Sequence, residues 1–174
     1  MTSTNPTPQP GPARSEFDHV DSAAHPEAYV GFLLRNRASG VRVRQQLSYD
    51  LLGAREGMRL LDVGCGIGDD VRALAALVGA SGRVVGLDNS ETMLEKAREL
   101  SAEAEFPGEF VLGDLLALPF DDATFDGCRA ERVLIHSEDP ELALAEMARV
   151  TRRGGVVVVT EARYGGADLP RQPA

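Results

Sequence analysis

Short apolar runs alternate with amphipathic stretches from residue 59 onward. Five of these runs have the length of strands: RLLDV (59–63), RVVGLD (83–88), EFVLGD (109–114), FDGCRAE (125–131) and GVVVVTE (155–161). Segments long enough for a helix separate them. Strands that alternate with helical segments are typical of a parallel sheet with crossover helices. The pattern therefore predicts an α/β fold with an open parallel sheet.

The intervening segments repeat their apolar residues at helical spacing. Two of them bury one stripe each: Val71, Leu74, Ala75 and Val78 in the first, and Met93, Leu94, Ala97 and Leu100 in the second. The first helix is expected to end at Gly79, and the second to be capped by Asn89 or Ser90. A later helix begins with Asp139 as its cap and Pro140 in its first turn.

The ends of the chain differ in composition from its middle. Residues 1–15 and 162–174 are rich in proline, glycine and small polar residues, which predicts flexible tails around one domain over residues 16–161. Between Pro26 and Gly53 the apolar residues follow helical spacing, and Gly40 interrupts them. We therefore expect two helices before the sheet.

Composition narrows the possible partners. The chain has 174 residues, of which 43% are hydrophobic, so it is long enough for one domain with a core. A formal net charge of -9 disfavours general binding to nucleic acid or to an anionic membrane surface. No apolar run is long enough to span a membrane and no secretion signal is readable, so we expect a cytoplasmic protein that binds a small ligand.

Only two cysteines occur, Cys65 and Cys128, and both fall in apolar segments. Their positions indicate small buried thiols rather than a disulfide framework or a metal site. We predict no metal.

The segment LLDVGCGIGDD (60–70) holds the most informative chemistry. Its glycines are spaced two apart, at Gly64, Gly66 and Gly68. Asp62 precedes the first of them, and Asp69 and Asp70 occupy the start of the next helix, where a dinucleotide would place its pyrophosphate. These carboxylates would repel phosphate and favour a nucleoside that carries ammonium and sulfonium groups. The alternative is a plain glycine turn whose acids complement the helix dipole.

Two further acids follow neighbouring strands. Asp88 ends the second strand, where an acidic side chain can accept hydrogen bonds from both ribose hydroxyls. Asp114 follows the third strand and is placed to bind an adenine amino group, with Leu115 stacked on the base. Each alone could be an ordinary strand end or turn. Together with the glycine loop they lie at the carboxyl ends of adjacent strands, where open α/β sheets bind their ligands.

These segments, together with FDGCRAERVLIH and MARVTRRGGVVVV, resemble the successive motifs of the class I S-adenosylmethionine-dependent methyltransferases over roughly residues 26–161. The resemblance is greatest to the branch that acts on quinones and small natural products. It implies a Rossmann-like sheet in the order 3-2-1-4-5 and S-adenosylmethionine as cofactor. It also implies methionyl contacts at Gly64, Cys65 and the Arg129 backbone, a ribose contact at Asp88, and adenine contacts at Asn89, Met93, Asp114 and Leu115. Asp62 and Gly66 of the glycine loop complete the expected cofactor-binding set.

Methyl transfer mainly requires that a nucleophile be aligned with the methyl group and that water be excluded. If the acceptor is a hydroxyl or an acidic carbon, His136 in LIH is the candidate general base. It could equally cap a short helix. Glu131 and Arg132 could orient the substrate or could be solvated, and His19 and His25 carry little weight.

The family fold continues after its fifth strand with a helix and a β-hairpin, and this sequence lacks a segment suited to that hairpin. Strand 155–161 would then become an edge strand, with the four valines at 156–159 facing solvent. We therefore expect a homodimer, or a complementing chain, to cover it.

The favoured function is methyl transfer to a carbon or oxygen of a small-molecule acceptor. One alternative is a protein that binds the cofactor but catalyses a non-methylating step such as cyclisation. The other is a non-catalytic partner subunit.

Overall fold

A computed structural model describes residues 14–36, 41–102 and 108–161 of the chain. The expected helix break at Gly40 and the expected C-terminal tail lie outside the described residues, as does most of the expected N-terminal tail. Arg14 and Ser15, assigned to that tail from the sequence, begin a 3-10 helix, η1 (Arg14–Ser22).

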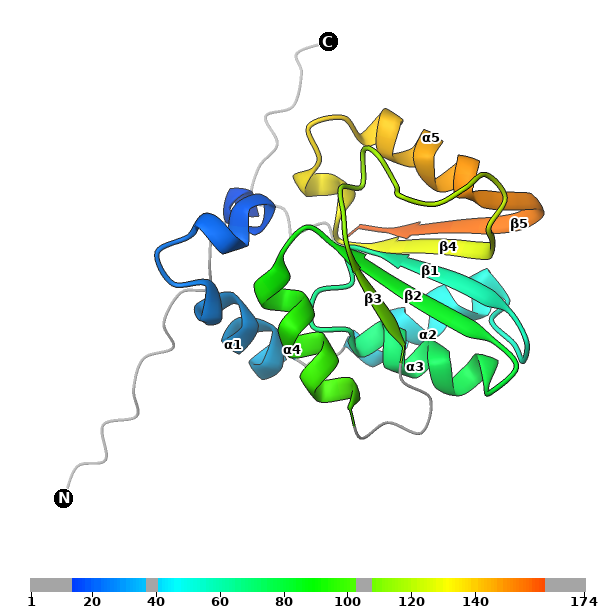
Figure 1. Cartoon of the computed structure of the whole chain (residues 1–174), viewed down its shortest axis with the longest axis horizontal. Coiled ribbons are helices and arrows are strands. Elements are labelled where there is room, and N and C mark those ends of the chain that lie inside the picture. Colours follow the sequence, from blue (N-terminus) through cyan, green and yellow to red (C-terminus); the bar gives the residue numbers. More distant parts are fainter. Residues whose placement is uncertain (1–13, 37–40, 103–107, 162–174) are drawn as a thin grey trace, which may run out of the picture.

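Five strands form one parallel sheet: β1 (Arg59–Val63), β2 (Arg83–Asp88), β3 (Glu109–Leu112), β4 (Phe125–Glu131) and β5 (Thr151–Thr160). Their order is β3-β2-β1-β4-β5, so the predicted α/β architecture and strand order are confirmed (Figure 1). β3 ends at Leu112, two residues before the predicted end of that strand. β5 begins at Thr151, four residues before the predicted start, because it continues directly from the preceding helix.

The remaining elements are α1 (Pro26–Asn36), α2 (Val41–Leu52), α3 (Asp69–Val78), α4 (Glu91–Ser101), the 3-10 helix η2 (Leu134–His136) and α5 (Pro140–Val150). Ser90 is the cap of α4, since its hydroxyl accepts from the Met93 N–H at 3.2 Å. Asp139 caps α5 by accepting from the Leu142 N–H at 3.0 Å, with Pro140 next to it as expected. These caps fix where α4 and α5 leave the sheet.

Helices cover both faces of the sheet (Figure 1). On one face α2 and α3 pack over β1, β2 and the end of β5, in a core that includes Leu52, Leu60 and Leu74. On the other face α5 packs over β4 and β5 in a core that includes Phe125 and Met147. α1 and η1 lie at the carboxyl end of the strands, beside α4. The N-terminal elements therefore stand where an open α/β sheet binds its ligand.

The valines of β5 are arranged differently from expectation. Val157 and Val159 pack toward the α5 core, and Val158 is 7% exposed in the α2 core, so only Val156 is largely exposed, at 41%. The prediction that all four face solvent is wrong, because successive side chains of a strand point to opposite faces and helices cover both. Within the described residues no strand pairs with the outer edge of β5.

None of the helices in the described part of the chain is both long and apolar enough to cross a membrane.

Candidate functional site

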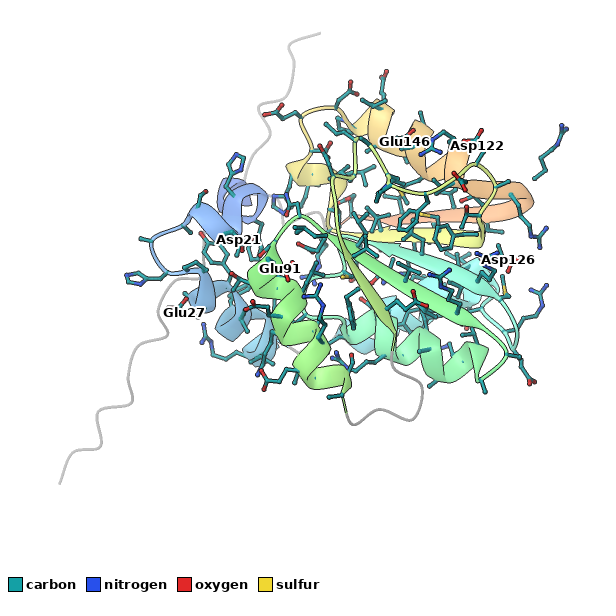
Figure 2. All side chains as sticks on the ribbon, viewed as in Figure 1. Asp21, Glu27, Glu91, Asp122, Asp126 and Glu146 are labelled. Carbon is teal, nitrogen blue, oxygen red and sulfur yellow. The ribbon has the colours of Figure 1, made fainter. Side chains whose placement is uncertain are left out.

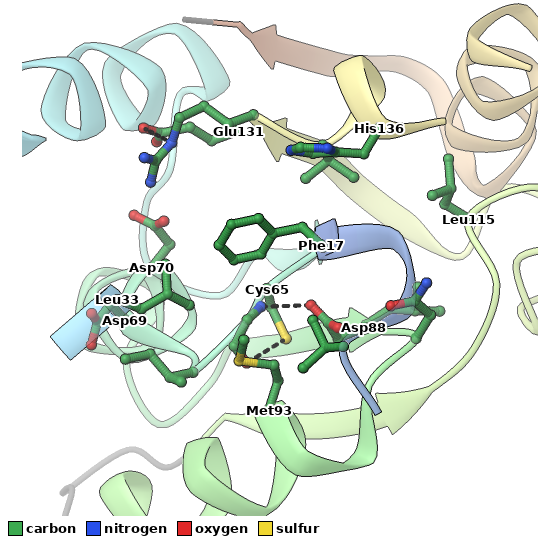
Figure 3. A pocket seen from close by; sticks show the side chains of 18 of the residues that line it. Phe17, Leu33, Cys65, Asp69, Asp70, Asp88, Met93, Leu115, Glu131 and His136 are labelled. Carbon is green, nitrogen blue, oxygen red and sulfur yellow. Dashed lines mark hydrogen bonds and ion pairs between the residues drawn. The ribbon is translucent and has the colours of Figure 1, made fainter. Parts of the chain in front are cut away.

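A cavity of about 1410 Å³ opens at the carboxyl ends of the strands. Its wall combines the glycine loop, the ends of β2, β3 and β4, and side chains from η1, α1 and α2 (Figure 3). Pockets for a single small ligand have volumes of about 300–1,000 Å³. This cavity therefore has room for two ligands side by side.

The glycine loop needs its glycines. Gly64, Gly66 and Gly68 have φ values of 67°, 52° and 74°, which residues with a side chain rarely adopt. A Cβ on Gly64 would stand 2.3 Å from a methyl group of Val133. The N–H groups of Gly64 and Cys65 both donate to the carbonyl of Leu87, at 2.7 and 3.0 Å. The loop is thereby held against the end of β2 with its backbone on the cavity.

Asp88 joins this loop to the start of α4. One carboxylate oxygen accepts from the Gly66 N–H at 2.8 Å, and the other accepts from the Ser90 N–H at 3.0 Å. Burial raises the pKa of Asp88, and the donated N–H groups partly oppose that shift. Each carboxylate oxygen has a second lone pair. Asp88 lines the cavity, so those lone pairs can accept from a pair of hydroxyls there.

The expected adenine residues all belong to the cavity wall. They are Asn89, Met93, Asp114 and Leu115. Met93 is buried, while Asp114 is exposed and accepts from the Leu116 N–H at 2.8 Å. The Asp114 carboxylate therefore closes a turn of its own backbone, as the simpler interpretation proposed, and also faces the cavity.

A buried ion cluster lies around Arg129, where β1 and β4 run side by side before the glycine loop. The Arg129 guanidinium contacts Asp62 at 2.8 Å, Asp70 at 3.0 Å and Glu131 at 2.7 Å. Asp62 is its direct cross-strand neighbour on β1. Tyr49 covers the guanidinium with its ring, 5.5 Å from the ring centroid, and its hydroxyl donates to Asp70. The side chains of Arg129, Asp62 and Glu131 are 1%, 3% and 6% exposed.

The cluster carries more negative than positive charge. Three carboxylates surround one guanidinium, which gives a formal charge of -2 when all three are ionised and -1 when Asp62 is protonated. Burial raises the pKa of Asp62 to about 7, although Arg129 lowers it. Burial alone would lower the pKa of Arg129, but Asp62 and Asp70 raise it overall. The cluster therefore favours a ligand that brings a positive charge.

Asp70 and Glu131 are among the described residues that line the cavity, whereas Asp62 and Arg129 are not. Within the described residues the Glu131 Oε1 atom is buried without a hydrogen-bond partner, and the Arg132 Nε atom lies 3.8 Å from it. Figure 3 shows Glu131 and Asp70 on the same side of the cavity. The solvated interpretation of Glu131 is therefore wrong. The negative charge that the sequence assigned to Asp62 is therefore presented to the cavity by Asp70 and Glu131, which share Arg129 with Asp62.

His136 lies across the cavity from Asp88 (Figure 3). It ends η2, and its backbone N–H donates to the carbonyl of Val133 at 2.9 Å. Its ring lies beside that of Phe17, with 5.8 Å between centroids (Figure 3). Arg132, just before η2, has a φ of 58°, an uncommon backbone conformation of the kind that clusters at functional sites. Phe17, Arg132 and His136 thus line a part of the cavity away from Asp88.

Sequence reasoning missed the contribution of η1. Phe17, His19 and Val20 line the cavity, although His19 was given little weight. The only signal in the sequence is the apolar pair Phe17 and Val20, three residues apart behind a proline-rich segment. His25 is exposed and is not among the lining residues.

Neither cysteine is set up as a nucleophile. Cys65 lines the cavity, but burial and the neighbouring Asp88 carboxylate raise the pKa of its thiol well above the usual value. Burial also raises the pKa of Cys128. In the described part of the chain, no three histidine, cysteine or acidic side chains are grouped as a metal site.

Comparison with known proteins places these features in a family. Residues 61–159 match the family model described as a methyltransferase domain. The chain is 44% identical over 110 residues to demethylmenaquinone methyltransferase of Staphylococcus aureus, a match that covers 63% of this chain and 45% of that protein.

Solved structures have the same fold. A S-adenosylmethionine-dependent methyltransferase from Aquifex aeolicus has a TM-score of 0.62 and 26% identity, over 71% of this chain and 68% of that one. The [4+2]-cyclase SpnF has a TM-score of 0.65 and 29% identity, over 72% of this chain and 47% of that one. The chain thus spans less than half the length of the curated relative and of the cyclase.

Proposed function

The chain belongs to the class I S-adenosylmethionine-dependent methyltransferases, and we propose that it transfers the methyl group of S-adenosylmethionine to a carbon or oxygen atom of a small-molecule acceptor. S-adenosylmethionine is the cofactor that this family membership implies. The observation that carries the proposal is the Asp88 carboxylate, hydrogen-bonded to the glycine loop, in a cavity large enough for two ligands.

The side chains suit the three parts of this cofactor. Asp88 would accept from the ribose hydroxyls, and Met93 and Leu115 would contact the adenine together with Asn89 and Asp114. Asp70 and Glu131 present the negative charge of the Arg129 cluster, which suits the methionyl ammonium. Gly64, Cys65 and Gly66 would lie under the methionyl chain.

When bound, S-adenosylmethionine supplies a methyl group activated by its sulfonium. The chain supplies alignment, because the loop and Asp88 fix one ligand while the wall formed by Phe17 and Val133 shapes the space for the other. Apolar walls also keep water from the reacting atoms. His136 would accept the proton of an acceptor hydroxyl or acidic carbon, since its ring lies on the cavity wall. A quinone-type acceptor is favoured by the similarity to a demethylmenaquinone methyltransferase.

One observation supports a second candidate function. The likeness to the [4+2]-cyclase SpnF raises the alternative that this chain binds the cofactor but catalyses a cyclisation without methyl transfer. The third alternative is a non-catalytic subunit, which binds the cofactor without turnover and acts only as the partner of another chain.

Transfer of a labelled methyl group separates these alternatives. The protein is incubated with S-adenosylmethionine labelled in its methyl group and a panel of reduced naphthoquinones, phenols and polyketide-like acids. Label in an extracted product supports methyl transfer. Consumption of a panel member without label supports the cyclase alternative, and cofactor binding with no turnover supports the subunit.

We further propose that two copies associate through β5. Its outer edge is unpaired within the described residues, and Val156 is 41% exposed there. Two-fold symmetric pairing is the commonest arrangement of soluble homo-oligomers, and through β5 it would cover this edge. The alternative occupant is a complementing chain.

Val156→Lys is expected to convert the dimer to a monomer, because it places a charge at the pairing edge. Leu77→Lys is the matched control, since Leu77 is 43% exposed on α3, away from this edge. Light scattering at micromolar concentration measures the mass of each variant. A wild-type protein that is monomeric at all concentrations would contradict the dimer and leave a complementing chain as the alternative.

A further inference from the structure

The segment η1 reaches into the cavity from outside the region that matches the family model. That match begins at residue 61, whereas η1 ends at Ser22. We call Arg14–Ser22 the strap. Its Phe17 ring projects into the cavity between His136 and Cys65 (Figure 3) and contacts the rings of Tyr29 and Phe32 as well. The strap therefore supplies part of the cavity wall that the matched region lacks.

Asp21 fastens the strap to the start of α4. Its carboxylate accepts from the Ser90 hydroxyl at 2.6 Å, from the Glu91 N–H at 2.7 Å and from the Thr92 N–H at 3.2 Å. Burial opposes ionisation, but these donors outweigh it and lower the pKa of Asp21. The first N–H groups of a helix have no partner within the helix, so they bind a carboxylate well.

The loop that Asp21 holds is also the loop that carries the candidate ribose residue. The Ser90 N–H donates to Asp88, and the other oxygen of Asp88 accepts from the Gly66 N–H. A continuous series of hydrogen bonds thus runs from Asp21 through Ser90 and Asp88 to the glycine loop. A ligand on Asp88 and a closed strap therefore require the same arrangement of this loop.

We propose that Asp21 is a positioning residue for the cofactor, which fastens the strap to the Asp88 loop so that the strap closes the cavity over the bound nucleoside. This inference rests on the proposed function, because it takes the ligand of Asp88 to be S-adenosylmethionine. Phe17, His19 and Val20 of the strap line the cavity, whereas Asp21 is not among the lining residues. Asp21 therefore does not touch the ligand itself and acts on it through Ser90 and Asp88. The cofactor then leaves only when the strap opens.

Loss of Asp21 should therefore shorten the residence time of the nucleoside. Asp21 is exposed, so solvent weakens its hydrogen bonds to Ser90, Glu91 and Thr92 relative to buried ones. We expect Asp21→Ala to raise the population of the open strap, and with it the dissociation rate of S-adenosylhomocysteine, by about 5-fold or more. The measurement uses the full chain loaded with labelled S-adenosylhomocysteine, chased with unlabelled ligand.

The chain offers a matched control in Asp126. Like the Asp21 carboxylate, that of Asp126 accepts from both backbone and side chain: from the Arg59 N–H at 2.7 Å and from the Arg152 Nε at 2.5 Å. Asp126 lies at the start of β4, across the molecule from Asp21 (Figure 2). Asp126→Ala should lower the unfolding temperature but leave the dissociation rate within about 2-fold of the wild type, because a merely structural carboxylate does not hold the cofactor loop.

The outcomes separate this inference from the proposed function. Failure of the wild type to bind S-adenosylhomocysteine contradicts the proposed function itself. A wild type that binds, with Asp21→Ala releasing ligand at the rate of Asp126→Ala, overturns the role of Asp21. If Asp21→Ala does not fold, Phe17→Ala decides, because it removes the cavity end of the same strap. Faster release from Phe17→Ala supports the strap, and an unchanged rate rejects it.

Discussion

The Arg129→Leu variant is expected to lose about 3–5 kcal/mol of its free energy of unfolding, the range for breaking a buried ion pair by removing one partner. Leucine leaves Asp62, Asp70 and Glu131 without the guanidinium that they share. For a chain of this length that loss lowers the unfolding temperature by roughly 6–20 °C. Urea and thermal unfolding followed by circular dichroism measure it.

The matched control is Arg83→Leu, which removes an ion pair with Glu109 whose two side chains are 45% and 52% exposed. Because solvent screens an exposed pair, its loss should cost less than about 1 kcal/mol. Equal losses in the two variants would contradict the structural role of the buried cluster.

The effect of Arg129→Leu should also depend on pH. Burial raises the pKa of Asp62 to about 7 in the folded chain, against about 4 in an unfolded one. The folded state then binds more protons between these values, so stability falls as pH rises through this window. Removing Arg129 raises the pKa of Asp62 further, so the two proteins lose stability in parallel up to about pH 6, and the deficit relative to the wild type should grow as the pH rises through 7 and above, where only the wild-type Asp62 ionises. A deficit that is constant with pH would exclude this origin.

His136→Ala is expected to lower kcat for methyl transfer by about 100-fold or more while the affinity for the cofactor stays the same. The imidazole lines the cavity on the side away from Asp88, and the backbone N–H that closes η2 survives the substitution. The labelled-methyl assay, run from pH 5 to pH 9, gives the rates. His25→Ala is the control, since His25 is exposed and is not among the cavity-lining residues. Parallel pH profiles for His136→Ala and the wild type would assign His136 to the structure of η2 instead.

Much of the fold was predictable because the apolar patterns were local. β1, β2 and β4 have the bounds that the sequence indicated, and Ser90 and Asp139 cap the expected helices. These features depend on residues a few positions apart. The valines of β5 were misjudged, because exposure on a strand depends on which helices cover each face of the sheet.

The candidate site was likewise predictable only where it depends on residues that are close in the sequence. The glycine loop and Asp88 were readable from motif spacing, and the structure brings both to one cavity. The partnership of Arg129 with Asp62 depends on the register of β1 and β4, two strands that are 67 positions apart at these residues. Asp21 reaches α4 from η1, a segment for which the sequence predicted no helix or strand. Contacts of this range leave no pattern in a single sequence.

The central claim is that this cavity binds S-adenosylmethionine on Asp88, and calorimetric titration of the wild type and of Asp88→Ala tests it most directly. We expect one site per chain in the wild type. Asp88→Ala should weaken binding by about 10- to 100-fold, or about 1.5–3 kcal/mol, because the ribose hydroxyls lose a charged acceptor. No binding to the folded wild type would contradict the claim, and equal affinity in the two proteins would remove Asp88 from the site.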